Sequence, residues 1–400
     1  MNATPLTDEV NAQYEKWVYP APIEDLDEWL RDSWQWFDPS HAHRLFWPDQ
    51  DYPVGMDILV AGCGTNQAAV IAYTNPSAHV VAIDVSDHSL DHHRQLARRY
   101  DLVNLDLHHL PIEQIADLDR DFDLVISTGV LHHLADPDAG LRALAQCLRP
   151  NAVLALMLYA SYGRLGVEIM QSVFTDLGLG RNESSLDLIR DAVTQVNPQH
   201  PLVGYLRIAD DLTDDAGLID TFVHARERSY TIDECREFVE SAGLVFQDLF
   251  HKAPYYPPAG SGSAFLTGIS TLPRELQWSV MERLNTLNAC HYFMACRADR
   301  PTPTYVIDFR SPEALQYVPS LRHRCHLQGD LLVRTGGQVR LEPWALDLVE
   351  QIDGQRSIEA ITARIASDEA PASTLAPLDL LETLWQQDYL AIGITPPIAP

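Results

Sequence analysis

Two glycines and one acidic residue form the pattern with the clearest chemical meaning. Gly62 and Gly64 lie in the run Ala61-Gly62-Cys63-Gly64-Thr65, directly after the apolar stretch 57–61. Glycines in such a turn let a ligand approach the backbone closely. Asp84 follows the next apolar stretch, where a carboxylate can accept hydrogen bonds from both hydroxyls of a ribose. The spacing predicts a site for a cofactor that contains a nucleoside.

The same turn argues against two common cofactors. The dinucleotide-binding pattern has a third glycine where this chain has Gln67. The turn also has no lysine, which phosphate-binding loops use to hold a nucleotide. NAD and ATP are therefore disfavoured, and a nicotinamide-dependent oxidoreductase is the weaker alternative.

Two histidines follow the apolar stretch 122–126. A histidine at this point can act as a general base near neutral pH. We take His132 as the candidate base or substrate contact, and a structural hydrogen bond is the alternative. Tyr159 ends the stretch 153–159 and Tyr162 follows it, and both are further candidates for the catalytic site.

Four other side chains are candidates for contacts with a substrate. Arg164 suits a carboxylate, because its guanidinium group can form two parallel hydrogen bonds. Tyr14 and Tyr19 lie in an aromatic N-terminal segment that must pack on a surface or cover a site. His224 follows Asp220 by four residues, which places both on one helix face, as a site or as a plain capping pair. No Cys/His set has zinc-binding spacing, so no metal is expected.

The elements that must position these residues alternate between strand and helix. Strands are predicted at 57–61, 79–83, 103–108, 122–126, 153–159, 244–250 and 291–297, and helices at 67–74, 87–100, 136–148, 231–242 and 276–286. This order predicts an α/β fold with a doubly wound, mostly parallel seven-stranded sheet. In such sheets the ligand lies at the carboxyl ends of the strands, where the candidate residues fall.

The regions in which strands and helices alternate, and those in which they do not, predict the domain boundaries. We predict an aromatic cap at 1–50, a cofactor-binding domain at 51–300 with a helical insertion at about 161–225, and a further domain at 304–400. Pro301-Thr302-Pro303 is the expected linker. Within the last domain, two short strands around Gly336-Gly337 precede helices at 344–352, 358–366 and 378–387.

Four stretches in order resemble the class I S-adenosylmethionine (SAM)-dependent methyltransferases. They are ILVAGCGT, the acid in VVAIDVS, FDLVIS and TGVLHHLADP, and they fall within residues 55–160. The resemblance implies SAM as cofactor, with Gly62 and Gly64 facing its methionyl part, Asp84 on the ribose and the loop at Ile112 beside the adenine. Where many members have an acid after the third strand, this chain reads His108-His109. The implied cofactor-binding set is Ala61, Gly62, Cys63, Gly64, Gln67, Asp84, Val85, Ile112, Thr128 and Gly129.

The segment 304–400 resembles two groups of winged helices. One is the small peptide-recognition domain of the PqqD type, and the other ends certain bacterial protein lysine methyltransferases. The resemblance rests on the turn Ile352-Asp353-Gly354 followed by Ser357. It implies recruitment of a peptide or protein, while a packing or homodimerisation domain is the alternative.

Composition limits the partners. The chain has 400 residues and a formal net charge of −28, from 56 acidic and 28 basic residues, so most of its surface would repel a nucleic acid. It has six cysteines without a C-x-x-C pair, and no apolar run approaches the roughly 18 residues of a membrane span. A cytoplasmic methyltransferase acting on an O or N nucleophile of a small molecule, peptide or protein is the leading interpretation. A non-catalytic SAM-binding scaffold is the alternative.

Overall fold

The computed structural model describes residues 8–258, 262–365 and 375–394. The chain divides into two compact units. The first comprises residues 1–37, 54–246 and 282–299, and the second comprises 38–53, 247–281 and 300–400. The predicted cap at 1–50 is thus divided between the two units. The chain passes from the first unit to the second for the last time between residues 299 and 300, next to the predicted linker at 301–303. In the described part of the chain, no helix is both long enough and apolar enough to cross a membrane.

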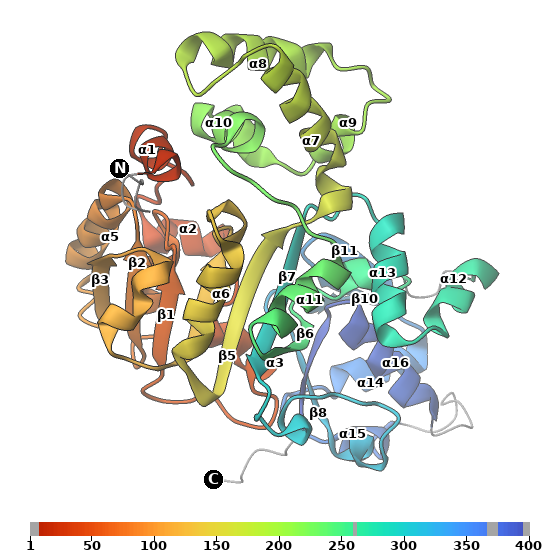
Figure 1. Cartoon of the computed structure of the whole chain (residues 1–400). Helices are drawn as coiled ribbons and strands as arrows, with labels where there is room; N and C mark the ends of the chain where they lie inside the picture. Colours follow the sequence, from red (N-terminus) through yellow and green to blue (C-terminus); the bar gives the residue numbers. More distant parts are fainter. Residues whose placement is uncertain (1–7, 259–261, 366–374, 395–400) are drawn as a thin grey trace. The chain divides into compact units, whose positions relative to one another are not determined.

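A seven-stranded sheet with the order β3-β2-β1-β4-β5-β7-β6 confirms the predicted fold class (Figure 1). Strands β1 to β5 pair in parallel, and β7 pairs antiparallel with β5. Strands β1, β2 and β4, and β5 from Ala152 onward, are almost wholly buried, as expected for a parallel sheet covered on both faces. The strands are β1 (Asp57–Ala61), β2 (His79–Asp84), β3 (Leu105–His109), β4 (Phe122–Thr128), β5 (Leu148–Tyr159), β6 (Leu244–Leu249) and β7 (Cys290–Arg297).

Helices alternate with these strands close to the predicted places. Ser86 caps the helix that begins at Asp87 by accepting a hydrogen bond from the Ser89 N–H. Thr231 and Glu234 form a capping box at the start of the helix that begins at Ile232. The helices are α4 (Gln67–Thr74), α5 (Asp87–Tyr100), α6 (Pro137–Gln146), α11 (Ile232–Ser241) and α13 (Arg274–Leu284).

The junction between α6 and β5 differs from the prediction. The helix ends at Gln146 and the strand already begins at Leu148, whereas the sequence predicted a helix to residue 148 and a strand from Val153. The pairing of β5 with β4 shifts register between Leu148 and Val153. Pro150 lies within this irregularity, where the missing N–H of proline breaks no regular ladder hydrogen bond.

The range 161–225 is helical, as predicted. Its helices pack around a core that includes Phe174, Ile189, Leu202 and Phe222, all of them buried. The helices are α7 (Ser161–Asp176), α8 (Glu183–Gln195), α9 (Leu202–Tyr205) and α10 (Asp215–Val223). Two helices of the N-terminal segment, α1 (Glu9–Lys16) and α2 (Leu26–Asp32), also belong to the first unit.

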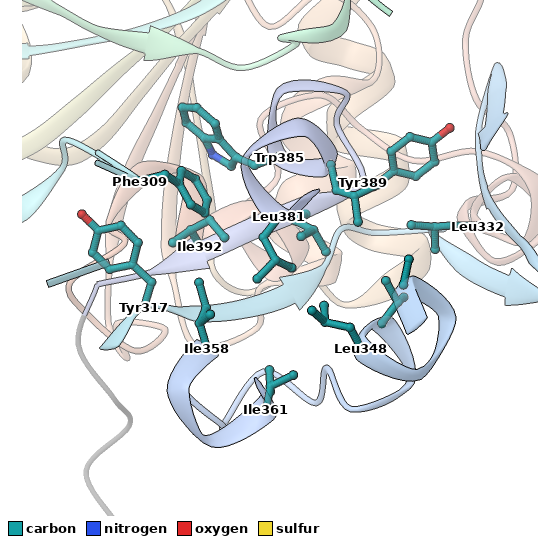
Figure 2. Packing of buried hydrophobic residues seen from close by; sticks show 14 of the residues in the cluster. Phe309, Tyr317, Leu332, Leu348, Ile358, Ile361, Leu381, Trp385, Tyr389 and Ile392 are labelled. Carbon is teal, nitrogen blue, oxygen red and sulfur yellow. The ribbon is translucent and has the colours of Figure 1, made fainter. Parts of the chain in front are cut away.

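The second unit has its own hydrophobic core. Figure 2 shows Leu332, Leu348, Ile358 and Leu381 converging with Trp385 in this core. The predicted strands around Gly336-Gly337 are confirmed as a hairpin, but three short strands and the early end of α15 were not predicted. The elements are α3 (Pro39–Phe46), α12 (Ala264–Ser270), β8 (Val318–Leu321), β9 (His326–Gln328), β10 (Leu331–Arg334), β11 (Gly337–Arg340), α14 (Pro343–Glu350), α15 (Ile358–Thr362), α16 (Leu375–Gln386) and β12 (Leu390–Gly393).

Candidate active site

A cavity of about 990 Å³ lies within the first unit. Its lining comes from the N-terminal residues 8–23, the turn after β1, the carboxyl ends of β2, β4 and β5, the insertion and the start of β7. This is the edge of the sheet at which the sequence placed the ligand. The volume is at the upper end of the range for small-molecule sites, about 300–1,000 Å³.

The turn after β1 needs its two glycines. Gly62 and Gly64 have φ angles of 72° and 51°, in the left-handed region that other residues rarely adopt. A Cβ atom on Gly62 would also lie 2.4 Å from a methyl carbon of Val130. The backbone of the turn can therefore form one wall of the cavity.

Asp84 ends β2 beside this turn. Its Oδ2 accepts a hydrogen bond of 2.9 Å from the Gly64 N–H, and its Oδ1 accepts one of 2.9 Å from the Ser86 N–H. Burial raises the pKa of the Asp84 carboxyl to about 6, against the lowering effect of these N–H groups. Each oxygen of the carboxylate keeps a lone pair for a ligand.

Nine of the ten predicted cofactor residues line the cavity. The exception is Ala61, which is fully buried in β1. Gln67 Nε2 donates to the Thr128 Oγ1 at 3.1 Å, which links the turn to the end of β4. The lining residues are Gly62, Cys63, Gly64, Gln67, Asp84, Val85, Ile112, Thr128 and Gly129.

Residues 8–23, which we call the N-terminal strap, join the cofactor turn to the insertion. At one end, Asn66 Nδ2 donates to the Ala21 carbonyl at 2.8 Å and Asn66 Oδ1 accepts from the Ile23 N–H at 2.7 Å. Two residues before Ala21, the Tyr19 hydroxyl donates to Asp211 Oδ2, in the insertion, at 2.6 Å. The predicted residues Tyr14 and Tyr19 both line the cavity.

A buried carboxylate, Asp220, is the centre of the opposite side of the cavity. The Tyr14 hydroxyl donates to its Oδ1 at 3.0 Å and the Tyr159 hydroxyl to its Oδ2 at 3.4 Å. His224 Nε2 lies 3.2 Å from the Tyr14 hydroxyl. Burial, and next the negative charge of Glu227, raise the pKa of Asp220 to about 7.

The two neighbouring histidines lie in different surroundings. His133, in the 3₁₀ turn Leu131–His133, lines the cavity, whereas the predicted base His132 does not. The His133 Nδ1 lies 2.8 Å from the Arg226 carbonyl oxygen, so Nδ1 carries the proton and Nε2 is a hydrogen-bond acceptor. His132 packs against Tyr159 with ring centroids 4.0 Å apart and the ring planes tilted by 33°. Burial lowers the pKa of His132, and it lowers that of His133 to about 3.

The predicted substrate residue Arg164 has a partner within the protein. Its Nη2 donates to both carboxylate oxygens of Glu227 at 2.9 Å, and its Nη1 donates to the Tyr205 hydroxyl at 2.9 Å. The guanidinium carbon lies 3.7 Å from the centre of the Tyr159 ring. Arg164 therefore orients two cavity tyrosines rather than offering free donors. Tyr162, on α7, does not line the cavity.

Three side chains approach one another closely enough to suggest a metal ion. The ligand atoms of His133, Asp220 and His224 all lie within 4.8 Å of one another. However, the Arg226 N–H donates to His224 Nδ1 at 3.0 Å, which places the histidine proton on Nε2. A ring nitrogen with its proton is a donor and not a metal ligand, so this hydrogen bond opposes metal binding by His224.

Sequence reasoning missed several residues that line the cavity. Asp220 was noted only as a neighbour of His224, and of the two histidines after the stretch 122–126 the sequence-based prediction was His132 rather than His133. No local spacing links these residues to the strap or to β7, because they come from separate elements. The missed lining residues include Trp36, His133, Met157, Tyr205, Asp211, Asp220, Cys290 and Tyr292.

Comparisons with known proteins identify a methyltransferase domain in this chain. Residues 59–154 match the family described as a methyltransferase domain. An uncharacterised protein of Synechococcus sp. is 29% identical over 336 residues, which are 80% of this chain and 78% of that protein. A malonyl-[acyl-carrier protein] O-methyltransferase of Acetivibrio thermocellus is 30% identical over 118 residues, which are 29% of this chain and 39% of that enzyme.

A solved structure extends the likeness of the fold. PKMT2 from Rickettsia typhi superposes with a TM-score of 0.62 at 15% identity, over 90% of this chain and 76% of that protein. A second structure of the same protein, in complex with AdoHcy, gives a TM-score of 0.61. The matched residues contain the glycine turn and Asp84, and the sheet to which they belong has the order β3-β2-β1-β4-β5-β7-β6. Residues 59–154 thus belong to the SAM-dependent methyltransferase domain of this chain.

Proposed function

We propose that the enzyme transfers the methyl group of SAM to an oxygen or nitrogen atom of an acceptor that enters the cavity of the first unit. The single observation that supports this most is the division of the cavity lining. One side carries the glycine turn and Asp84, while the other carries a buried carboxylate ringed by tyrosines. A donor and an acceptor can thus be held in one enclosed volume.

The cofactor side fits SAM residue by residue. In this proposal Gly62 and Gly64 face the methionyl part, Asp84 binds the ribose hydroxyls, and Val85 and Ile112 border the adenine. No positively charged side chain is needed there, because SAM has no phosphate. The missing third glycine at Gln67 fits the same conclusion, because Gln67 instead donates to Thr128.

The acceptor side supplies alignment and a proton acceptor. A sulfonium already carries a reactive methyl group, so the protein mainly holds the nucleophile in line and excludes water. The Asp220 carboxylate is placed to take a proton from an O–H or N–H, and its pKa of about 7 suits that role. The His133 Nε2 can accept a hydrogen bond from the substrate, but its pKa of about 3 makes it a weak base. His133 replaces the predicted His132 as the histidine that contacts the substrate, because only His133 lines the cavity.

The acceptor is a small molecule, or a side chain of a peptide or protein. The net charge of −28 disfavours a polyanion. The malonyl-[acyl-carrier protein] O-methyltransferase acts on an oxygen, which keeps an oxygen nucleophile among the candidates.

The test is transfer of a labelled methyl group. The full-length enzyme is incubated with methyl-labelled SAM and a fractionated bacterial extract, and labelled small molecules and proteins are identified by mass spectrometry. We expect a labelled product that the Asp84→Ala variant forms far more slowly. If SAM binds by calorimetry and yet no fraction of the extract becomes labelled, the enzyme does not act on the proposed acceptor classes.

Asp84→Ala should weaken SAM binding by about 2–3 kcal/mol, because two charge-assisted hydrogen bonds to the ribose are lost. Calorimetry should show the dissociation constant rising by about 30- to 150-fold. Asp87→Ala is the matched control, because Asp87 is an exposed carboxylate three residues away. Equal affinity in wild type and Asp84→Ala would place the ribose elsewhere.

For the second unit, we propose a winged-helix-like recruitment domain at residues 304–400. A chain that ends at residue 300 should keep its affinity for SAM, because every residue that lines the cavity belongs to the first unit. If the domain recruits a peptide or protein, KM should rise while kcat changes little. Unchanged KM and kcat would contradict recruitment.

The same truncation should also lower stability, and light scattering and thermal unfolding should accompany the kinetics. Asp388 accepts hydrogen bonds of 3.0 Å from the N–H groups of Lys252 and Ala253, and Gln387 Nε2 donates to the Pro257 carbonyl at 3.0 Å. These contacts belong to the second unit, so residues 247–281 lose partners when residues 301–400 are removed. A change of oligomeric state would indicate a structural role for the domain.

A further inference from the structure

Three tyrosine hydroxyl protons on the acceptor side of the cavity are already used within the protein. The hydroxyls of Tyr14 and Tyr159 donate to Asp220, and the hydroxyl of Tyr19 donates to Asp211. A tyrosine hydroxyl has one proton, so none of the three has a second proton for a ligand.

The positive charges on this side are paired as well. Arg164 donates to Glu227 and to Tyr205. Arg226 Nη1 lies 3.4 Å from Asp8 Oδ2 and 3.4 Å from the His133 carbonyl oxygen. An acceptor with a negative charge would therefore meet cations that already have carboxylate partners.

Lone pairs remain unused. The Asp220 carboxylate has about four acceptor positions and receives two hydroxyl protons, and the His133 Nε2 is a further acceptor. Among the residues that the structure describes, neither Asp211 nor Asp220 forms an ion pair with a lysine or arginine. Around Asp220, the free polar capacity is therefore that of hydrogen-bond acceptors with negative charge.

We propose that the methyl acceptor is an amine that enters the cavity as an ammonium ion and is bound by Asp220, with Asp211 adding negative charge. An ammonium group has donors and no acceptor, which complements this side of the cavity. An alcohol is a poorer fit because it brings one donor, and a carboxylate brings none. The proposal rests on the proposed function, since it specifies the acceptor of the same site. A free amine and a lysine side chain share this chemistry.

The reaction balances with the groups present. The ammonium ion gives one proton to the Asp220 carboxylate, and the neutral nitrogen then attacks the methyl carbon of SAM. A nitrogen–carbon bond forms, and the carbon–sulfur bond breaks with its electron pair going to sulfur. The products are S-adenosylhomocysteine and a methylated ammonium ion. Burial raises the pKa of Asp220 to about 7, which suits a carboxyl group that must take up a proton near neutral pH.

The test measures binding to the full-length enzyme saturated with S-adenosylhomocysteine. The probes are benzylammonium, benzyl alcohol and benzoate, which share one ring, and Nα-acetyl-lysine methylamide, which represents a lysine side chain. We expect at least one of the two amines to bind about tenfold or more tightly than benzyl alcohol, because charge-assisted hydrogen bonds are the stronger ones. Comparing the two amines distinguishes a free amine from a lysine side chain. Equal or tighter binding of benzyl alcohol or benzoate would overturn the proposal.

Two variants separate charge recognition from a structural effect. Asp220→Asn should lose about tenfold or more of the amine affinity. Asp191→Asn removes the same charge at an exposed position on α8, away from the cavity, and should keep the wild-type amine affinity. Amine affinity that stays unchanged in Asp220→Asn, or that falls equally in Asp191→Asn, would contradict the role of Asp220. If S-adenosylhomocysteine itself fails to bind, the proposed function fails; if it binds and amines are not preferred, only this inference fails.

Discussion

Replacing Arg164 by alanine is expected to lower the free energy of unfolding by about 3–5 kcal/mol. The side chains of Arg164 and Glu227 are only 2% and 8% exposed, so the variant would leave a carboxyl group buried without its cation. The loss should be larger at pH 8 than at pH 5. Without its cation, the buried Glu227 carboxyl has a pKa in the folded state above its ordinary value. Between these two pKa values the folded state keeps a proton that the unfolded state has lost, so the stability of the variant falls as the pH rises through this interval. Urea unfolding at both pH values measures the effect.

A double replacement tests the cause. Arg164→Met combined with Glu227→Met removes both charges and should recover most of the lost stability, because hydrophobic side chains can replace a buried ion pair. Arg181→Ala is the comparison at the surface, where its ion pair with Glu9 should contribute less than about 1 kcal/mol. A loss in Arg164→Ala as small as that in Arg181→Ala would show that Glu227 finds another partner or water.

The cofactor side of the cavity could be predicted because one continuous segment builds it. Strand β1, the glycine turn, α4 and β2 follow one another, so the positions of Gly62, Gly64 and Asp84 are fixed by local spacing. The side chains reach the cavity because the strands are parallel and end at the same edge of the sheet. A pattern of this kind can be recognised in the sequence without knowledge of the rest of the fold.

The acceptor side could not be predicted in the same way. Tyr14 and Asp220 are 206 positions apart and meet only because the strap crosses to the insertion. The choice between His132 and His133 depends on a 3₁₀ turn of three residues and on the Arg226 carbonyl, and neither is visible in the sequence. Arg164 looked like a substrate clamp because its partner Glu227 lies 63 positions away.

The division into units shows a third kind of limit. The sequence predicted one domain boundary near residues 301–303. In the structure, the chain passes from the first unit to the second between residues 299 and 300. It did not predict that residues 38–53 and 247–281 join the second unit. Short buried strands such as β8 and β12 have only four residues each, too few for a periodic pattern to stand out.

Deleting residues 1–20 is expected to slow methyl transfer by about 100-fold or more while leaving measurable SAM binding. The deletion removes Tyr14 and Tyr19, which line the acceptor side and hydrogen-bond to Asp220 and Asp211. Loss of such positioning, together with entry of water, commonly costs about this much in rate. Asp84 and the glycine turn remain, so calorimetry should still detect SAM, and stopped-flow displacement should show faster release of S-adenosylhomocysteine.

Deletion of residues 1–7 alone is the matched control, because it leaves the N-terminal strap intact. This shorter chain should transfer the labelled methyl group at close to the wild-type rate. Two point variants narrow the cause: Thr65→Val removes the hydrogen bond of 2.8 Å from Thr65 Oγ1 to the Pro20 carbonyl, and Tyr19→Phe removes the bond to Asp211. Faster release of S-adenosylhomocysteine in Thr65→Val, with its fold intact by circular dichroism, would indicate that the strap closes the cavity over the cofactor. Full transfer activity in the chain that begins at residue 21 would instead show that residues 8–20 serve only for packing. Asp220 would then support methyl transfer without its hydrogen bond from Tyr14.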